Sequence, residues 1–190
     1  MPAPDPLPRE LTDAEIAALL RAANDDGRLI VMGLLSGMSA EEIVALDWDQ
    51  LDLDAGTIRI SGESPRALPI NAPIAQLIIG RRALQPQAAG AVLCSPSGAP
   101  LPLDDIRSLV MYAAYDAGIE AADEVTLRTL RHTYLVYLLR QGIRFADIGR
   151  IVGRLPQEEL AGYMRFAPSQ PRRPLEQINL VLPALRDMTG

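Results

Sequence analysis

The chain is organised around residues 125–163, VTLRTLRHTYLVYLLRQGIRFADIGRIVGRLPQEELAGY. The spacing of the apolar residues and the breaks at Gly142 and Gly153 predict three helices in this stretch. The first helix carries Arg131 and His132 near its start, and the third presents Tyr163. We interpret the remaining segments as the support for these side chains.

The composition is typical of one soluble domain. A chain of 190 residues with 48% hydrophobic content can bury one sizeable core, and no second domain is required. The first ten residues, MPAPDPLPRE, predict a disordered arm over residues 1–10 and not a signal peptide. No apolar run reaches the roughly 18 residues of a membrane helix, and Cys94 is the single cysteine. These features predict a cytoplasmic protein that does not bind membranes.

The charged residues restrict the chemistry. All 18 residues of the lysine-plus-arginine count are arginine, and His132 is the only histidine. A mechanism that needs a lysine as general acid, or two histidines, is therefore excluded. The exclusive use of arginine is explained equally well by a GC-rich genome. The net charge is −6, but residues 121–190 hold 10 arginines against 7 acidic residues, a balance of +3. A DNA-facing surface is expected in this C-terminal third.

Local patterns elsewhere predict short helices and a hairpin. Thr12 and Glu15 have the spacing of a capping box at a helix start, and the residues from Asn24 to Gly27 are expected to end that helix. Pro183 is expected to kink or end a last helix that begins near residue 175, after a proline-rich linker. The predicted fold is mainly α with a small antiparallel β-sheet (α+β). The other expected helices span residues 28–36, 40–46, 74–84 and 103–117, and the expected strands span residues 57–60, 67–70 and 92–94.

The order of these motifs resembles the tyrosine recombinases, also called the phage integrase family. Residues 130–133 read Leu-Arg-His-Thr, and the Leu138-Leu139 pair follows at the family's position. Tyr163 stands nine residues after Arg154, as the nucleophilic tyrosine of the family does after a histidine. Residues 34–43 and 48–52 resemble two upstream elements of the family. The resemblance implies a catalytic domain over residues 11–168, without the family's separate N-terminal DNA-clamping domain.

The family attacks a DNA phosphodiester with its tyrosine and forms a 3′-phosphotyrosine intermediate. The resemblance implies that Tyr163 is at the nucleophile position and that Arg131 is the second of two arginines that bind the phosphate oxygens. The reaction uses no metal ion, no other cofactor and no small-molecule substrate. His132 beside Arg131 is interpreted mainly as a buried structural histidine.

Four positions depart from the family pattern. Ser39 stands where the first catalytic arginine belongs, and Glu63 takes the place of the hairpin lysine that protonates the leaving oxygen. Arg128 and Arg154 stand where the family has histidine, or histidine or tryptophan. Arg66 is positive and close to Glu63 in sequence, but an arginine holds its proton too tightly to act as a general acid. Arg66, Arg128, Arg131 and Arg154 are candidate DNA contacts.

These departures lead to three hypotheses. The first is a degenerate recombinase that no longer cleaves and rejoins DNA efficiently, yet binds DNA or acts as an accessory or regulatory subunit. The second is a protein-interaction module that has lost DNA binding, and the third is an active recombinase with a rerouted active site. Residues 169–190 are expected to form a linker and a C-terminal helix that docks on a neighbouring recombinase subunit or another copy. The alternative is a tail that folds back on its own core.

Overall fold

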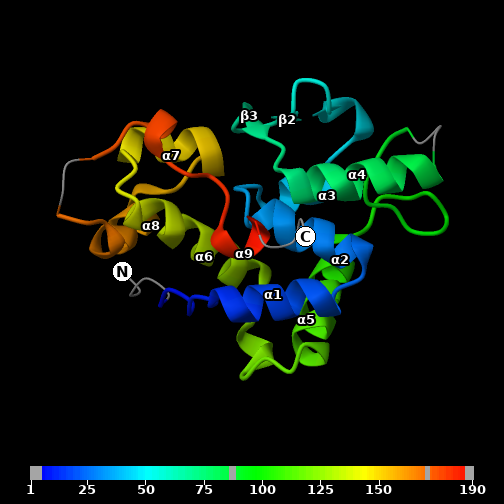
Figure 1. Cartoon of the computed structure of the whole chain (residues 1–190), viewed down its shortest axis with the longest axis horizontal. Coiled ribbons are helices and arrows are strands. Elements are labelled where there is room, and N and C mark those ends of the chain that lie inside the picture. Colours follow the sequence, from blue (N-terminus) through cyan, green and yellow to red (C-terminus); the bar gives the residue numbers. More distant parts are fainter. Residues whose placement is uncertain (1–5, 86–88, 170–171, 187–190) are drawn as a thin grey trace.

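A framework of helices surrounds a three-stranded sheet in the computed structural model, which describes residues 6–85, 89–169 and 172–186 (Figure 1). This confirms the prediction of a mainly α fold with a small antiparallel sheet. No helix within the described ranges is long and apolar enough to cross a membrane. The α-helices are α1 (Asp13–Ala22), α2 (Asp25–Leu34), α3 (Ala40–Val44), α4 (Ala72–Leu84), α5 (Leu103–Asp116), α6 (Leu127–Arg140), α7 (Phe145–Val152), α8 (Gln157–Tyr163) and α9 (Pro183–Arg186). The strands are β1 (Leu51–Asp52), β2 (Thr57–Ile60) and β3 (Arg66–Pro69), and 3-10 turns lie at Trp48–Gln50, Ala122–Glu124, Met164–Phe166 and Leu175–Gln177.

Side-chain caps set where the first two helices begin. The Thr12 hydroxyl accepts from the Glu15 amide at 3.2 Å, and the Glu15 carboxylate accepts from the Thr12 amide at 2.8 Å, as the capping-box pattern predicts. Asn24 caps α2 by accepting from the Gly27 amide at 2.8 Å. The prediction that this segment only ends the first helix is therefore wrong, and α2 begins three residues earlier than expected.

The hairpin forms almost where the sequence places it. Strand β2 matches the prediction, and β3 begins one residue earlier, so that Arg66 pairs with Ile60 in the antiparallel ladder. Because side chains alternate along a strand, Arg66 lies on the same inward face as the buried Leu68. The strand expected at residues 92–94 does not form, since the backbone makes only isolated bridges at Ala91 and Cys94.

The core lies between α2 and the helices around it. Helix α2 contacts α4, α5 and α6, and nearly all of its apolar side chains are buried. Helix α6 is buried along most of its length, including Leu130 and Leu138. A helix that is apolar almost all round needs neighbours on every side, which is why α2 and α6 lie at the centre. This rigid centre holds the first turns of α6, where Arg131 and His132 lie.

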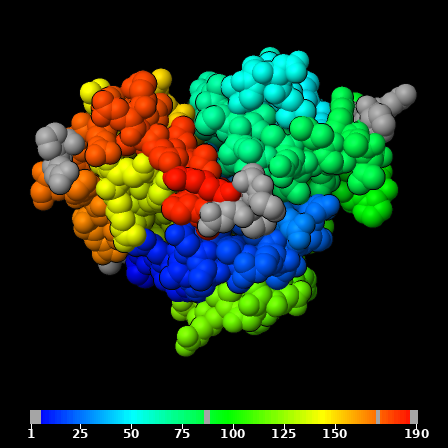
Figure 2. All heavy atoms as spheres, viewed as in Figure 1, coloured from blue at the N-terminus to red at the C-terminus, as the bar shows by residue number. Residues whose placement is uncertain are grey.

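The C-terminal segment is not the long helix that the sequence predicts. A 3-10 turn is followed by extended chain and then by α9, which starts at Pro183 because proline suits the first turn of a helix. Ile178, Leu182 and Leu185 are buried in the core of their own chain, and α9 packs on α1. Figure 2 shows the red C-terminal segment against the blue N-terminal helices. Exchange of this segment with a neighbouring subunit stays a prediction.

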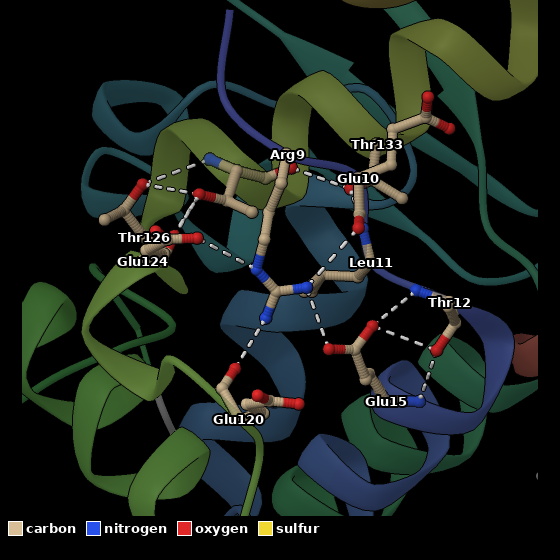
Figure 3. A network of polar contacts seen from close by, with 10 residues as sticks. Arg9, Glu10, Leu11, Thr12, Glu15, Glu120, Glu124, Thr126 and Thr133 are labelled. Atoms are coloured by element: carbon tan, nitrogen blue, oxygen red, sulfur yellow. Dashed lines mark hydrogen bonds and ion pairs between the residues drawn. The ribbon is translucent and has the colours of Figure 1, made fainter.

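The segment before α1 packs on the core from Leu7 onward, whereas residues 1–5 of the predicted arm lie outside the described residues. Figure 3 shows Arg9 between Glu15, Glu120 and Glu124. The amide of Leu11 donates to the Thr133 hydroxyl on α6 at 3.0 Å. These contacts contradict the prediction of disorder for residues 6–10. The sequence gives little warning of them because all of these partners except Glu15 lie more than 100 positions away.

Candidate active site

Ser39, which the sequence predicts at the position of the first catalytic arginine, caps a helix. Ser39 is the N-cap of α3, where its hydroxyl accepts from the Glu42 amide at 3.2 Å. The Glu42 carboxylate accepts in return from the Ser39 amide at 2.8 Å. This capping box satisfies two backbone groups at the start of the helix. It offers no cation to a phosphate.

Arg66 fills the interior of the site from the hairpin side. Its guanidinium binds both carboxylate oxygens of Glu42, at 2.6 and 2.7 Å. Its other donors reach the carbonyl oxygens of Ile151 at 2.8 Å, Gly37 at 2.9 Å and Ser64 at 3.0 Å. A guanidinium has five N–H groups, and all five are engaged. Arg66, one of the four candidate DNA contacts, therefore has no donor left for a phosphate in this arrangement.

Two glycines make room for this arginine. Gly37 has a φ of +101°, and a Cβ there would lie 2.8 Å from the carbonyl oxygen of Ile151. Gly153 has a φ of +75°, and a Cβ there would lie 3.0 Å from a guanidinium nitrogen of Arg66. Side chains are excluded at both turns by backbone conformation and by space. The turn before α3 and the turn after α7 can therefore close around Arg66.

Arg131 lies beside Arg66 but keeps donors for a ligand. One of its terminal nitrogens donates to the Gly37 carbonyl at 3.4 Å, and the other donates to the Val152 carbonyl. Arg66 and Arg131 thus cap the last carbonyls of α7, which suits the negative end of a helix dipole. Burial, and then the nearby Arg66, lower the pKa of Arg131, while Glu42 opposes this effect. Three N–H groups of Arg131 have no protein partner in the described part of the chain.

A cavity of about 630 Å³ opens in front of Arg131, between α3, α5, α6 and the turn before α8. Arg128 and Arg154 line it together with Arg131, and Ser39 lines the α3 side. Its positive charge is partly offset by acidic residues, including Glu159. The structure thus brings together four of the predicted positions in one concave surface. Glu63 is exposed in the hairpin turn, outside the described lining of this cavity.

Tyr163 is buried and lies outside the described lining of this cavity. It is 3% exposed, and its hydroxyl lies 2.9 Å from Nδ1 of His132. Phe166 packs edge-on against the His132 ring, with the ring centroids 5.8 Å apart. Burial and, to a smaller extent, Glu159 raise the pKa of Tyr163 to about 12, against the opposing effect of Arg128 and Arg131. The phenol is therefore protonated at neutral pH.

His132 is buried and holds the phenol of Tyr163. Burial lowers the pKa of His132 below its ordinary value, although Glu10 opposes this effect. A neutral imidazole with its proton on Nε2 accepts the hydrogen bond of the phenol at Nδ1. The Tyr163 contact was not predicted from sequence, because the two residues are 31 positions apart and lie on different helices. The Glu42–Arg66 pair was missed for the same reason, with a separation of 24 positions.

A model of the "Phage integrase family" matches residues 9–167. The chain belongs to the phage integrase family. An "Integrase" of Streptomyces ambofaciens is 29% identical over 177 residues, which cover 76% of this chain and 46% of the relative. "Tyrosine recombinase XerA" of Thermococcus kodakarensis is 27% identical over 186 residues, which cover 94% of this chain and 65% of the relative. The chain therefore spans between about half and two thirds of the length of these two integrase relatives.

Solved structures of phage integrase and tyrosine recombinase proteins share the fold. The crystal structure of XerA recombinase superposes with a TM-score of 0.73 at 21% identity, covering 96% of this chain and 65% of that one. A XerH site-specific recombinase bound to a palindromic difH substrate gives a TM-score of 0.71 at 21% identity, covering 87% and 52%. At these identities the likeness establishes the architecture. The chemistry of this member of the family depends on its own side chains.

Proposed function

We propose that this protein binds DNA as an accessory or regulatory member of its family and does not cleave and rejoin DNA efficiently. One observation carries the proposal. In the cavity where a phosphate would lie, Arg131 has free donors and the Ser39 hydroxyl caps a helix, while Arg66 lies outside the cavity lining and is fully occupied. The loss of one donor to a developing oxyanion typically slows a reaction by a factor of about 10²–10³.

The proton-transfer groups support the same proposal. A leaving 5′ oxygen needs a proton, yet the chain has no lysine. Arg66 cannot replace one, because arginine does not release its proton at neutral pH. Glu63 adds a negative charge to the hairpin turn that would approach the phosphate backbone. Tyr163 has to leave His132 and lose a proton whose pKa is about 12 before it can attack.

DNA binding needs fewer groups than cleavage does. Arg128, Arg131 and Arg154 converge on one cavity, and each can contribute a phosphate contact. The C-terminal third that contains them has a net charge of +3. The XerH site-specific recombinase, which shares this fold, has been solved bound to its palindromic difH substrate. We assign the corresponding role here to the cavity in front of Arg131.

Covalent trapping tests the proposal. The protein is incubated with nicked suicide duplexes that carry recombination core sites, and with random duplex, beside a Tyr163→Phe control. A denaturing gel detects a phosphotyrosine adduct, and a native gel of the same samples detects binding. We expect binding without an adduct. An adduct that Tyr163→Phe abolishes would instead establish an active recombinase with a rerouted site.

A second candidate function is a protein-interaction module that does not bind DNA. The observation that favours it is the stretch of residues 103–124, which has six carboxylates against one arginine. Absence of both binding and adduct on all the duplexes would favour this candidate. In that case the net positive charge of the C-terminal third would contact a protein partner.

A further inference from the structure

An apolar wall lines one side of the cavity in front of Arg131. Leu103, Arg107 and Met111 are four positions apart on α5, so they share the face of this helix that borders the cavity. Leu155, just before α8, adds to the apolar part of the lining. A phosphate gains nothing from apolar surface, because it is more stable in water. The wall is therefore unused if DNA contributes only its backbone.

The charged groups of the cavity also fit more than a phosphate. Its lining has four arginines and the three carboxylates of Glu41, Asp123 and Glu159, so the charges nearly balance. All three acidic residues are exposed. Carboxylates accept hydrogen bonds from N–H groups, whereas they repel phosphates. The cavity therefore suits a ligand that combines one anionic group, an apolar body and N–H donors.

The arginines of the cavity differ in depth. Arg128 and Arg154 are exposed, whereas Arg131 is half-buried and keeps three N–H groups without a protein partner in the described residues. An anion that reaches the half-buried cation gains most, because water screens the attraction less there. The cavity volume of about 630 Å³ lies within the roughly 300–1,000 Å³ that is usual for sites of small organic ligands. A ligand can thus enter the cavity with its anionic group on Arg131.

A nucleotide has these three features. It carries a phosphate, its base has apolar faces, and cytosine, adenine and guanine have amino groups that donate to carboxylates. In a duplex, stacking covers the faces and pairing occupies the edges, so only an unpaired nucleotide can offer them to a protein. We propose that the cavity takes one unpaired nucleotide, with its phosphate on Arg131 and its base against the α5 wall. Here we rely on the proposed function and add to it the form of DNA that the cavity prefers.

Bulged duplexes test this pocket. Fluorescence anisotropy compares a fully paired duplex, the same duplex with one extra cytosine in one strand, and a duplex with an abasic residue in place of that cytosine. The abasic bulge keeps the phosphate and the flexibility of the bulge but lacks the base. We expect the cytosine bulge to bind about tenfold more tightly than the abasic bulge, because only cytosine offers an apolar face and an amino group.

Two variants on α5 locate the base. Met111→Glu places a charge on the wall of the cavity, and Tyr112→Glu adds the same charge at the next position, which is exposed and lies outside the lining. Both variants repel DNA alike, so the ratio of the two bulge affinities is the informative quantity. Met111→Glu should reduce this ratio to within about twofold, because a carboxylate disfavours contact with the base face, whereas Tyr112→Glu should keep it. Circular dichroism checks that both variants are folded, and a ratio that Met111→Glu leaves unchanged would overturn the proposal.

Free nucleotides separate this pocket from DNA binding. Calorimetric titration without DNA compares dCMP with 2-deoxyribose 5-phosphate, which has the same phosphate but no base. Binding of dCMP that is about tenfold tighter would support the pocket even if no duplex is bound. A preference for the base in the bulged duplex alone would identify a nucleotide within a strand as the ligand. Binding that is indifferent to the base in both experiments would overturn the pocket, while duplex binding would still support the proposed function.

Discussion

Arg66 is the residue on which the arrangement of the candidate site depends most. Its guanidinium is 5% exposed and joins α3, the hairpin and the end of α7. Arg66→Ala would leave the Glu42 carboxylate buried without its cation, which typically costs about 3–5 kcal/mol of unfolding free energy. Urea denaturation measures the loss. Arg107→Ala is the control, because its pair with Asp104 is exposed and is worth at most about 0.5 kcal/mol. Equal effects of the two substitutions would contradict the structural role of Arg66.

Tyr163 makes the stability of the protein depend on pH in the alkaline range. Its pKa is about 12 in the folded protein against 10.0 for an ordinary tyrosine. Between these two values the unfolded chain has lost the phenolic proton and the folded chain retains it. The contribution of Tyr163 to the free energy of unfolding is therefore fully present below about pH 10. It is lost toward pH 12, by about 1.4 kcal/mol per pH unit for this one group.

Urea denaturation at about pH 9, 10 and 11 measures this effect. Tyr163→Phe removes the titrating phenol, so its free energy of unfolding should fall less steeply over the same range than that of the wild type. Tyr134, whose burial also raises its pKa, is unchanged in both proteins and contributes equally. Parallel curves for the two proteins would show that the phenol of Tyr163 ionises as freely in the folded state as in the unfolded state.

The C-terminal segment is the element whose packing is most readily tested. Leu185 on α9 is fully buried, and α9 packs on α1. Leu185→Ala is expected to reduce the free energy of unfolding by about 2–5 kcal/mol, because it removes packed methyl groups and leaves a cavity. Leu84→Ala is the matched control, since this leucine is 83% exposed and its loss should change stability by less than about 0.5 kcal/mol. Thermal and urea denaturation distinguish the two results.

Elements with local signals were predictable, and elements that depend on distant partners were not. The Thr12 cap and strand β2 follow from neighbouring residues, and the structure has both as expected. Pro183 predicts a helix break, although proline also suits a helix start, and only the packing of α9 on α1 decides between these roles. At the site, the sequence predicted that Arg131 lies near the start of a helix, and α6 begins at Leu127. It did not reveal that Arg66 is bound to Glu42, because a separation of 24 residues leaves no local pattern.

At the scale of the whole molecule, charge is divided between two surfaces. Residues 103–124 have a net charge of −5, whereas Arg128, Arg131 and Arg154 lie together in the lining of the cavity. A negatively charged protein can therefore present a positive surface to a polyanion, provided that it approaches from one side.

The salt dependence of DNA binding tests this division. Each phosphate contact releases counterions, so the logarithm of affinity falls with the logarithm of salt concentration by about 0.9 per contact on a duplex. Removal of two contacts in Arg131→Ala/Arg154→Ala should reduce the slope by roughly 2 and weaken binding to all sequences alike. Arg21→Ala is the control, since this exposed arginine of α1 lies outside the cavity lining. Fluorescence anisotropy over a salt series gives both slopes. If the double variant and the control both kept the wild-type slope, DNA would bind elsewhere, and the cavity in front of Arg131 would no longer explain the function.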